Sequence, residues 1–406
     1  MGNPPRKPPR LWSPRASRRS RLGPYTPRAP IGKDITCRRR PLFLRSAAVR
    51  DLETAHRKLE HIKLVLSADV DYRVSTLFDD VILLHNALPE LSTEEIDTSA
   101  ELFGRKFDMP LMIDSMTGGT KIAERINRNL AEAAREANIP VSCGSQRAAV
   151  EDPSLAGTYR VMRRVGGDVF IVGNIGAQQL VEDPVRIATE VVSMIDADAL
   201  AIHLNPLQEA VQSRGNVDLR GCMDAISDVV KGVGVPVIVK ETGAGISAEV
   251  ASRLAELGVA AINVSGAGGT SWSAVELERL RMQGASREYE VYRVFRDWGI
   301  PTAAALIEVV RSVNIPVIAS GGLRTGLDIA KAMALGASFT GIAKPFLRLA
   351  LEGKEEVAAY ISVLKEQLRT AMFLTGARNI EDLRKVKYVI VGRLREWLMS
   401  RGLLRA

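Results

Sequence analysis

Between residues 109 and 342, eight short apolar runs each end in a small polar or glycine-rich segment, and a helical pattern follows. Because these runs are apolar throughout and are bounded by turn signals such as Asn138-Ile139-Pro140, they are typical of parallel strands buried on both faces. Eight such units predict an α/β fold, a closed (β/α)8 TIM barrel; a doubly wound open sheet is the alternative. The predicted strands are 111–115, 141–143, 169–172, 199–203, 235–240, 260–264, 317–320 and 339–342.

The predicted barrel divides the chain into four parts. These are a basic extension (1–50), a segment that covers the barrel mouth (51–108), the barrel (109–354) and a C-terminal part with helices at 357–370 and 380–398. A long excursion separates the sixth strand from the seventh. The helices predicted within the barrel are 122–136, 155–164, 185–195, 223–230, 248–257, 303–313 and 326–335.

The positive charge of the chain is concentrated in its first 50 residues. They contain 14 Lys or Arg and one acidic residue, Asp34, for a net charge of +13. Subtracting this from the total of +8 leaves −5 on the other residues. High charge and frequent proline cannot build a core, so we predict disorder there. Three interpretations stay open: a dispensable extension or misassigned start, an organellar targeting segment, or an arm that contacts a polyanion.

Composition limits the compartment and the partners. No apolar stretch approaches the roughly 18–20 residues needed to cross a bilayer, so no membrane partner is expected. The cysteines Cys37, Cys143 and Cys222 are few, odd in number and without metal-ligand spacing. This is typical of a reducing environment rather than a disulfide framework, and we expect a cytoplasmic protein. Aromatic residues do not interleave with the basic ones, so no nucleic acid is expected as a partner.

Two glycine-rich segments late in the chain favour a phosphate site. Residues 320–326 end the seventh predicted strand, and residues 341–344 end the eighth. Phosphate sites in TIM barrels are often built from these two loops, because glycine lets backbone N–H groups approach the phosphate oxygens. Arg324 and Lys344 add positive charge there. Simple tight turns are the alternative.

Other polar residues are expected at the same mouth. Lys240 ends the fifth strand, where an unpaired ammonium is costly to desolvate, so we expect an anion or an electron-rich ring beside it. Pairing with Glu241 is the alternative. After the fourth strand, His203 to Glu209 form a polar cluster. One carboxylate plus substrate phosphates is the usual way to hold Mg²⁺, and Glu209 fits that role. A lone histidine or glutamate is otherwise more often structural.

Cationic residues exceed what one cofactor phosphate needs. Residues 145–147 read Ser-Gln-Arg after the second strand, and Arg57-Lys58 precede the barrel. Arginine suits bidentate phosphate binding, and lysine adds a point charge. We therefore infer a second anion, a phosphorylated substrate, although Arg57 and Lys58 could instead form a solvated helix face. The cationic candidates are Arg57, Lys58, Arg147, Lys240 and Arg324.

The polar and glycine-rich motifs described above, in their order along the chain, resemble those of the FMN-dependent type 2 isopentenyl diphosphate isomerases. The resemblance covers about residues 51–400 and is strongest to the archaeal branch. The resemblance implies a homo-oligomer, tetramer or octamer, that interconverts isopentenyl and dimethylallyl diphosphate in isoprenoid biosynthesis. It also implies reduced FMN as an acid/base cofactor, Mg²⁺, and NADPH as reductant. The motifs that carry it are 57–61, 85–90, 116–119, 144–147, 174–176, 203–209 and 266–270.

The resemblance also implies roles for individual residues. FMN would be held by Ser115, Met116, Thr117, Gly118, Ser145, Asn174, Lys240, Ser265 and Thr270, and its phosphate by Gly322, Leu323, Arg324, Ala343 and Lys344. The substrate would face Arg57, Lys58, Ser145, Gln146, Arg147, His203, Asn205 and Gln208, and Glu209 would bind Mg²⁺. Our own hypothesis for catalysis is that Lys240 tunes the charge of the reduced flavin and Gln208 orients the moving proton, with His203 as a third catalytic residue.

One departure from the family pattern lies directly after Glu209. The family commonly continues Gln-Glu with Gln-Pro-Glu-Gly, whereas residues 212–216 read Gln-Ser-Arg-Gly-Asn, with Arg214 in place of an acid. The alternative enzyme on the same barrel is an FMN-linked 2-hydroxy acid oxidoreductase. Such an enzyme needs a histidine base late in the barrel, and no histidine follows His203. A polyanion-binding protein that acts through its basic extension is the alternative from another class.

Overall fold

The computed structural model describes residues 47–404, so the predictions for residues 1–46 fall outside the described part. The described chain begins with helix α1 (Ala47–Ser67), whose side chains are described from Arg57 onward. Arg57 and Lys58 therefore lie on a helix that precedes the barrel.

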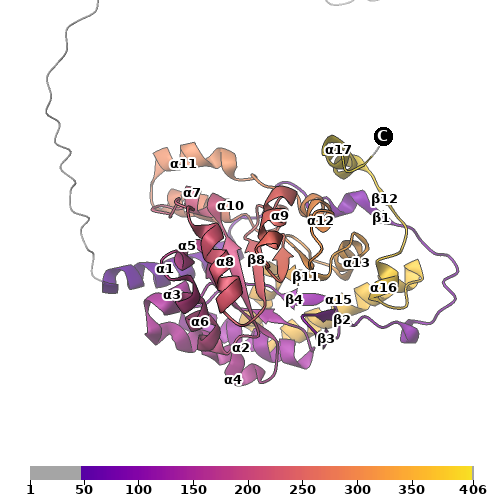
Figure 1. Cartoon of the computed structure of the whole chain (residues 1–406), viewed down its shortest axis with the longest axis horizontal. Helices are drawn as coiled ribbons and strands as arrows, with labels where there is room; N and C mark the ends of the chain where they lie inside the picture. Colours follow the sequence, from indigo (N-terminus) through magenta and orange to yellow (C-terminus); the bar gives the residue numbers. More distant parts are fainter. Residues whose placement is uncertain (1–46, 405–406) are drawn as a thin grey trace, which may run out of the picture. The chain divides into compact units, whose positions relative to one another are not determined.

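The eight predicted strands form a closed parallel barrel, which confirms the TIM-barrel prediction and excludes the open sheet. Around the barrel the order is β10-β11-β4-β5-β6-β7-β8-β9, so the last strand, β11, closes on the first, β4 (Figure 1). Every residue of β6 and β8 is buried, as expected for strands enclosed by helices. The strands are β4 (Leu111–Ile113), β5 (Val141–Ser142), β6 (Ile171–Gly176), β7 (Ala199–Leu204), β8 (Val237–Glu241), β9 (Ala261–Asn263), β10 (Val317–Ser320) and β11 (Phe339–Ile342).

Helices between the strands cover the outside of the barrel. α2 shows why they form: the Thr120 hydroxyl accepts from the Ala123 amide at its N-terminus, and Ile126 and Leu130 face inward, buried. The helices are α2 (Lys121–Glu136), α3 (Arg147–Glu151), η3 (Pro153–Ala156), α4 (Gly157–Gly166), α5 (Ala177–Leu180), α6 (Pro184–Ile195), α7 (Pro206–Val211), α8 (Cys222–Gly232), α9 (Ala248–Glu256), α12 (Thr302–Val310), α13 (Gly326–Ala334) and α14 (Lys344–Glu352).

The long excursion after β9 is mostly helical. It contains α10 (Trp272–Met282), α11 (Ser286–Tyr292) and the short turn η4 (Arg293–Phe295) before α12. The Ser271 hydroxyl accepts from the Ala274 amide and so caps α10 at its N-terminus. The excursion therefore places one more helix beside the barrel mouth.

The prediction of a helix over residues 380–398 was wrong. The segment consists of a short helix α16 (Ile380–Leu383), strand β12 (Tyr388–Ile390) and helix α17 (Gly392–Ser400). β12 pairs antiparallel with β1 (Val81–Leu83), far away in the sequence (Figure 1). Asp80, directly before β1, fixes the pairing of β1 with β12. Its backbone carbonyl accepts from the Val391 amide at 2.9 Å, and its carboxylate accepts from the Leu394 amide at 2.8 Å.

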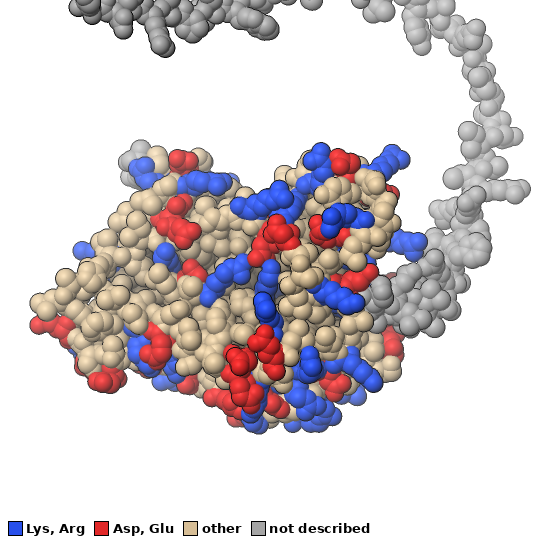
Figure 2. All heavy atoms as spheres, turned by 180° about the vertical axis from the view of Figure 1, so that it is seen from behind, with Lys and Arg blue, Asp and Glu red and all other residues tan. Residues whose placement is uncertain are grey.

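The remaining elements lie on either side of the barrel in the sequence. They are η1 (Phe78–Asp80), η2 (Thr93–Glu95), the hairpin of β2 (Ala100–Leu102) and β3 (Arg105–Phe107), and the long helix α15 (Lys354–Thr375). Figure 2 shows basic and acidic side chains interspersed over one face of the molecule. Among residues 47–404, every helix is too short or too polar to cross a membrane.

Candidate active site

A cavity at the carboxyl ends of the strands collects most of the predicted site residues. It is closed over in part by α1, which contributes Arg57, Lys58 and His61. The lining therefore combines the barrel mouth with a helix that precedes the barrel. The predicted residues that line it are Arg57, Lys58, Ser115, Met116, Ser145, Arg147, Asn174, His203, Asn205, Gln208, Glu209, Lys240, Ser265, Thr270, Gly322, Leu323, Arg324, Ala343 and Lys344.

Three predicted residues do not line this cavity. Gln146 is fully buried; its amide donates to the Val191 carbonyl at 2.8 Å, and its Oε1 accepts from the Asn174 amide at 3.0 Å. Gln146 therefore lies outside the cavity and holds the backbone of Asn174, which lines it. Gly118 packs so closely on Tyr159 that a side chain would collide with the ring. Thr117 lines a smaller adjoining cavity that shares Lys58 and Thr270 with the first.

Three cations form one group at the mouth, which we call the α1 cation group: Arg57, Lys58 and Arg147. Loss of hydration, followed by repulsion from Arg57 and Arg147, lowers the pKa of Lys58 to about 8. The pKa of Arg57 is lowered as well, first by burial and then by Arg147. Arg147 also pairs with Glu151 at 2.6 Å. Burial and the basic neighbours thus disfavour the charged forms of Arg57 and Lys58, and a bound anion would relieve this repulsion.

His203, at the end of β7, is held as a neutral imidazole. Burial and then Lys240 and Lys58 lower its pKa to about 3. Its Nδ1 lies 2.8 Å from Asn174 Oδ1, and the Asn174 amide nitrogen donates to the Cys143 carbonyl. The amide oxygen is therefore the acceptor, Nδ1 carries the proton, and Nε2 is left as a proton acceptor.

Gln208 belongs to a buried network that the sequence reasoning missed. Its side-chain amide donates to Glu276 Oε1 at 3.3 Å, and His61 Nε2 lies 2.9 Å from the same oxygen. The guanidinium of Arg279 donates to Glu276 at 2.7 Å and to Glu60 at 2.9 Å. Although burial raises the pKa of Glu276, the contacts from His61 and Arg279 prevail and lower it to about 2. Glu276 is therefore an anion that fixes the orientation of Gln208.

Glu209 is buried on α7 with its carboxylate surrounded by donors. Asn205 donates to one oxygen at 3.0 Å, and the Asn216 amide donates to the other at 2.6 Å. Gln212 lies at 3.5 Å from that second oxygen. Among residues 47–404, no group of three or more His, Cys, Asp or Glu is arranged to hold a metal ion. A metal here would therefore depend on one carboxylate and on oxygens of a ligand.

Lys240, at the end of β8, is buried beside the cavity. Its ammonium donates to the backbone carbonyl of Glu241 at 2.8 Å. The Glu241 carboxylate turns away and accepts from the amides of Thr242, Gly243 and Ala244. Burial nevertheless raises the pKa of Glu241 to about 7. The Lys240–Glu241 ion pair considered from the sequence does not form, and the ammonium lines the cavity.

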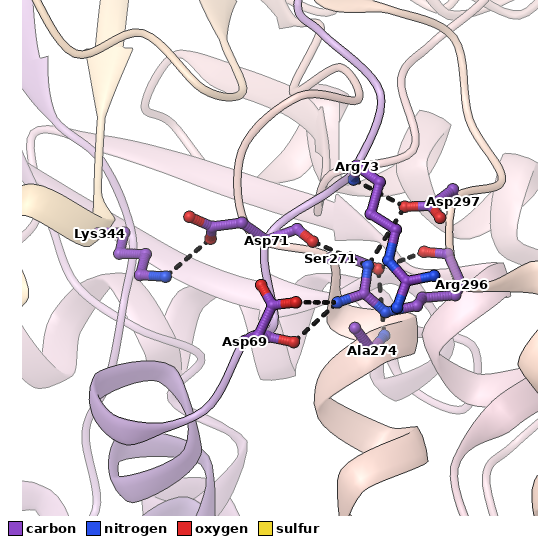
Figure 3. A network of polar contacts seen from close by, with 8 residues as sticks. All are labelled: Asp69, Asp71, Arg73, Ser271, Ala274, Arg296, Asp297 and Lys344. Carbon is purple, nitrogen blue, oxygen red and sulfur yellow. Dashed lines mark hydrogen bonds and ion pairs between the residues drawn. The ribbon is translucent and has the colours of Figure 1, made fainter.

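The predicted phosphate loop after β10 packs on the loop after β9 through glycines. A Cβ on Gly269 would lie 2.6 Å from the Gly322 amide nitrogen, so the loop after β9 packs directly on the loop after β10. Arg324 and Lys344 both reach Asp71, at 3.0 Å and 2.7 Å (Figure 3 shows the Lys344 contact). Asp71 lies between α1 and η1 and was not predicted. These two basic residues form a second group, the β10–β11 cation pair.

Several buried polar atoms at the mouth lack a protein partner. Among residues 47–404, Thr117 Oγ1, Thr270 Oγ1 and Asn205 Oδ1 are buried without a hydrogen bond. Buried polar atoms are rarely left unpaired, so these three atoms are expected to meet a ligand or water. Together with the glycine loops and the two cation groups, they fit a phosphorylated, hydrogen-bonding cofactor of the flavin nucleotide type.

Comparison with known proteins identifies the class. A family model described as "FMN-dependent dehydrogenase" matches residues 72–156 and 176–389. The chain is 50% identical to the isopentenyl-diphosphate delta-isomerase of Methanothermobacter thermautotrophicus over 346 residues, which cover 85% of this chain and 96% of that protein. It is 50% identical to the isomerase of the same name from Pyrococcus abyssi, covering 86% and 96%. Within the FMN-dependent class, the chain therefore belongs to the isopentenyl-diphosphate delta-isomerase family, as predicted.

The similarity to solved structures supports the assignment of the fold and not that of the function. A lactate oxidase of Pediococcus acidilactici matches with a TM-score of 0.60 at 17% identity, covering 85% of this chain and 94% of that one. A mandelate oxidase variant with an FMN adduct matches with a TM-score of 0.55 at 18% identity, covering 83% and 93%. The oxidase alternative thus shares this barrel, but this chain lacks a histidine after His203.

Proposed function

We propose that the chain interconverts isopentenyl and dimethylallyl diphosphate at the barrel mouth, as a step of isoprenoid biosynthesis. One observation carries the proposal: two separate groups of cations face one cavity. The β10–β11 cation pair fits the single phosphate of FMN. The α1 cation group of Arg57, Lys58 and Arg147 then remains for the diphosphate of the substrate.

The remaining lining suits FMN. The hydroxyls of Thr117 and Thr270 are available to hydrogen-bond the cofactor, and the backbone N–H groups of glycine loops of this kind commonly bind phosphate. When bound and reduced, FMN supplies an electron-rich ring that can exchange a ring-nitrogen proton. We propose NADPH as the reductant and the Lys240 ammonium as the group that stabilises the negative charge of the reduced ring.

The isomerisation adds a proton at one allylic carbon and removes one at the other. Gln208 is held by Glu276, so its amide is oriented before substrate arrives. His203 presents an unprotonated Nε2 to the same cavity. We propose that Gln208 orients the moving proton and that His203 contacts the substrate without carrying charge. The protein thereby supplies position and electrostatics at the reacting carbons.

We propose that Glu209 holds Mg²⁺ together with the substrate diphosphate. Its three donors hold the carboxylate in place, and a single carboxylate plus phosphate oxygens is a common Mg²⁺ arrangement. Glu209→Gln should raise the Mg²⁺ concentration needed for half-maximal activity by at least about tenfold. FMN binding, followed by flavin fluorescence, should stay unchanged. Unaltered Mg²⁺ dependence in this variant would remove Glu209 from the metal site.

The decisive experiment is anaerobic incubation with isopentenyl diphosphate, FMN, Mg²⁺ and dithionite, with dimethylallyl diphosphate as the assayed product. Air-oxidised protein is the control and should be inactive. Gln208→Ala should bind FMN normally and lose turnover, and Gln283→Ala, on an exposed turn after α10, is the matched control. Turnover of lactate or mandelate in place of isomerisation would support the oxidase alternative. Light scattering of the same preparation tests the proposed tetramer or octamer.

A further inference from the structure

Asp71 is a carboxylate inserted between the two cations of the phosphate site. Its Oδ1 accepts from the Lys344 ammonium at 2.7 Å, and its Oδ2 accepts from the Arg324 guanidinium at 3.0 Å. Each oxygen thus takes one cation, as two oxygens of a phosphate would. Both cations line the cavity, and the Asp71 side chain is about one-third exposed.

The backbone of Asp71 is fixed from the opposite side. Residues 70–72 pair with the loop after β9: the Ser271 amide donates to the Val70 carbonyl, and the Tyr72 amide donates to the Gly269 carbonyl, both at 2.8 Å. Arg296 donates to the Asp71 carbonyl at 3.0 Å, and Figure 3 shows the carboxylate pointing away from that contact toward Lys344. The side chain can therefore rotate off the cations while its backbone keeps its place.

The negative charge of Asp71 opposes a bound phosphate monoester. Arg324 and Lys344 carry two positive charges, and Asp71 cancels one of them. A dianionic phosphate would find a net charge of +1 with Asp71 in place, and +2 without it. Asp71 also partly neutralises the two cations, which would otherwise repel each other.

We propose that Asp71 is a built-in competitor of the cofactor phosphate: it occupies Arg324 and Lys344 when FMN is absent and weakens FMN binding when it is present. This inference rests on the proposed FMN site. Asp71 acts on affinity through the two cations, so it is a positioning residue and takes no part in the chemical step. The consequence is a flavin that dissociates more readily than the cation pair alone would allow.

The test compares Asp71→Asn with wild type by titration of FMN and of riboflavin, which has the same ring and no phosphate. Asp71→Asn should bind FMN about tenfold more tightly and riboflavin within about twofold of wild type. Asp69→Asn, whose carboxylate is 82% exposed and pairs with Arg296 instead, is the matched control and should change neither affinity. Asp71→Ser, a second variant without the charge, should behave like Asp71→Asn.

Inorganic phosphate provides an independent measurement. It should compete with FMN at lower concentration in Asp71→Asn than in wild type, since it would meet the same unpaired cations. Weaker or unchanged FMN binding in both Asp71 variants, with melting curves that show folded protein, overturns the inference and leaves the FMN site standing. Equal tightening of FMN and riboflavin also overturns it. Wild-type protein that binds neither flavin refutes the proposed FMN site and the competition together.

Discussion

Raising the pH should weaken diphosphate binding through Lys58. The pKa of Lys58 is about 8, because it is deprived of hydration and lies near Arg57 and Arg147. Its charged fraction then falls from about nine-tenths at pH 7 to about one-hundredth at pH 10. A bound diphosphate favours the charged form and raises the pKa of Lys58 in the complex. Binding therefore takes up a proton between the two pKa values, and affinity falls as pH rises above 8.

The size of the effect follows from these protonation states. If Lys58 stays charged in the complex, affinity drops by up to about tenfold per pH unit, and by about 50-fold between pH 8 and pH 10. Below pH 7 Lys58 is charged in both states, and its contribution to affinity is complete. The neighbouring Cys143 thiol adds little in this range, since burial raises its pKa to about 12.

The assay is calorimetric binding of isopentenyl diphosphate to protein loaded with oxidised FMN, in which no turnover is expected. Two buffers with different ionisation enthalpies report the proton taken up directly. Lys58→Arg is the control, because a guanidinium remains protonated up to pH 10. A wild-type affinity that does not change between pH 7 and pH 10 would refute the argument, as would the same slope in Lys58→Arg.

Two further predictions concern the assembly of the mouth. Glu276→Gln leaves Arg279 with Glu60 but removes the buried anion that His61 and Gln208 share, so it should cost about 2–4 kcal/mol of unfolding free energy. Isomerase turnover should fall at least about tenfold, while FMN affinity stays near wild type. Urea unfolding measures the loss of stability, and single-turnover assays measure the loss of turnover. A Glu276→Gln variant that is as stable and as active as wild type would contradict this role of the network. Removal of residues 1–46 should leave kcat and KM unchanged, because α1 begins at Ala47 and the described site residues begin at Arg57. Lost activity in a folded truncation would favour the polyanion-binding interpretation.

The barrel could be predicted from the sequence because its strands are buried on both faces. A strand such as β8 is apolar from Val237 to Val239, and the polar residues of the mouth follow directly, so local pattern and position agree. β12 was missed because only its pairing with β1 defines it. Two of its three residues, Tyr388 and Ile390, are half-buried, and the apolar run was absorbed into a longer helical pattern. No local signal connects segments so far apart in the sequence.

The site residues also divide into those that a local sequence pattern reveals and those that only distant contacts define. Residues at strand ends were found, because a TIM barrel gathers its strand ends around one mouth. Gln146 follows a strand as well, but its side chain turns into the interior toward Val191, which spacing alone does not reveal. Glu276 was missed because it lies within the helix α10. The available signal was a glutamate between the buried residues Val275 and Leu277.

The loop after β9 connects the two halves of the mouth. On the cofactor side, Gly269 packs against the phosphate loop and its carbonyl accepts from Tyr72, next to Asp71. On the substrate side, the same loop runs into α10, where Glu276 binds His61 of α1. The segment before the barrel is therefore hydrogen-bonded to this loop through Tyr72 and to helix α10 through His61. Arg57, Lys58 and Asp71 lie on that one segment, so the loop after β9 and helix α10 together fix the position of two cations of the α1 cation group and of the carboxylate that pairs with Arg324 and Lys344.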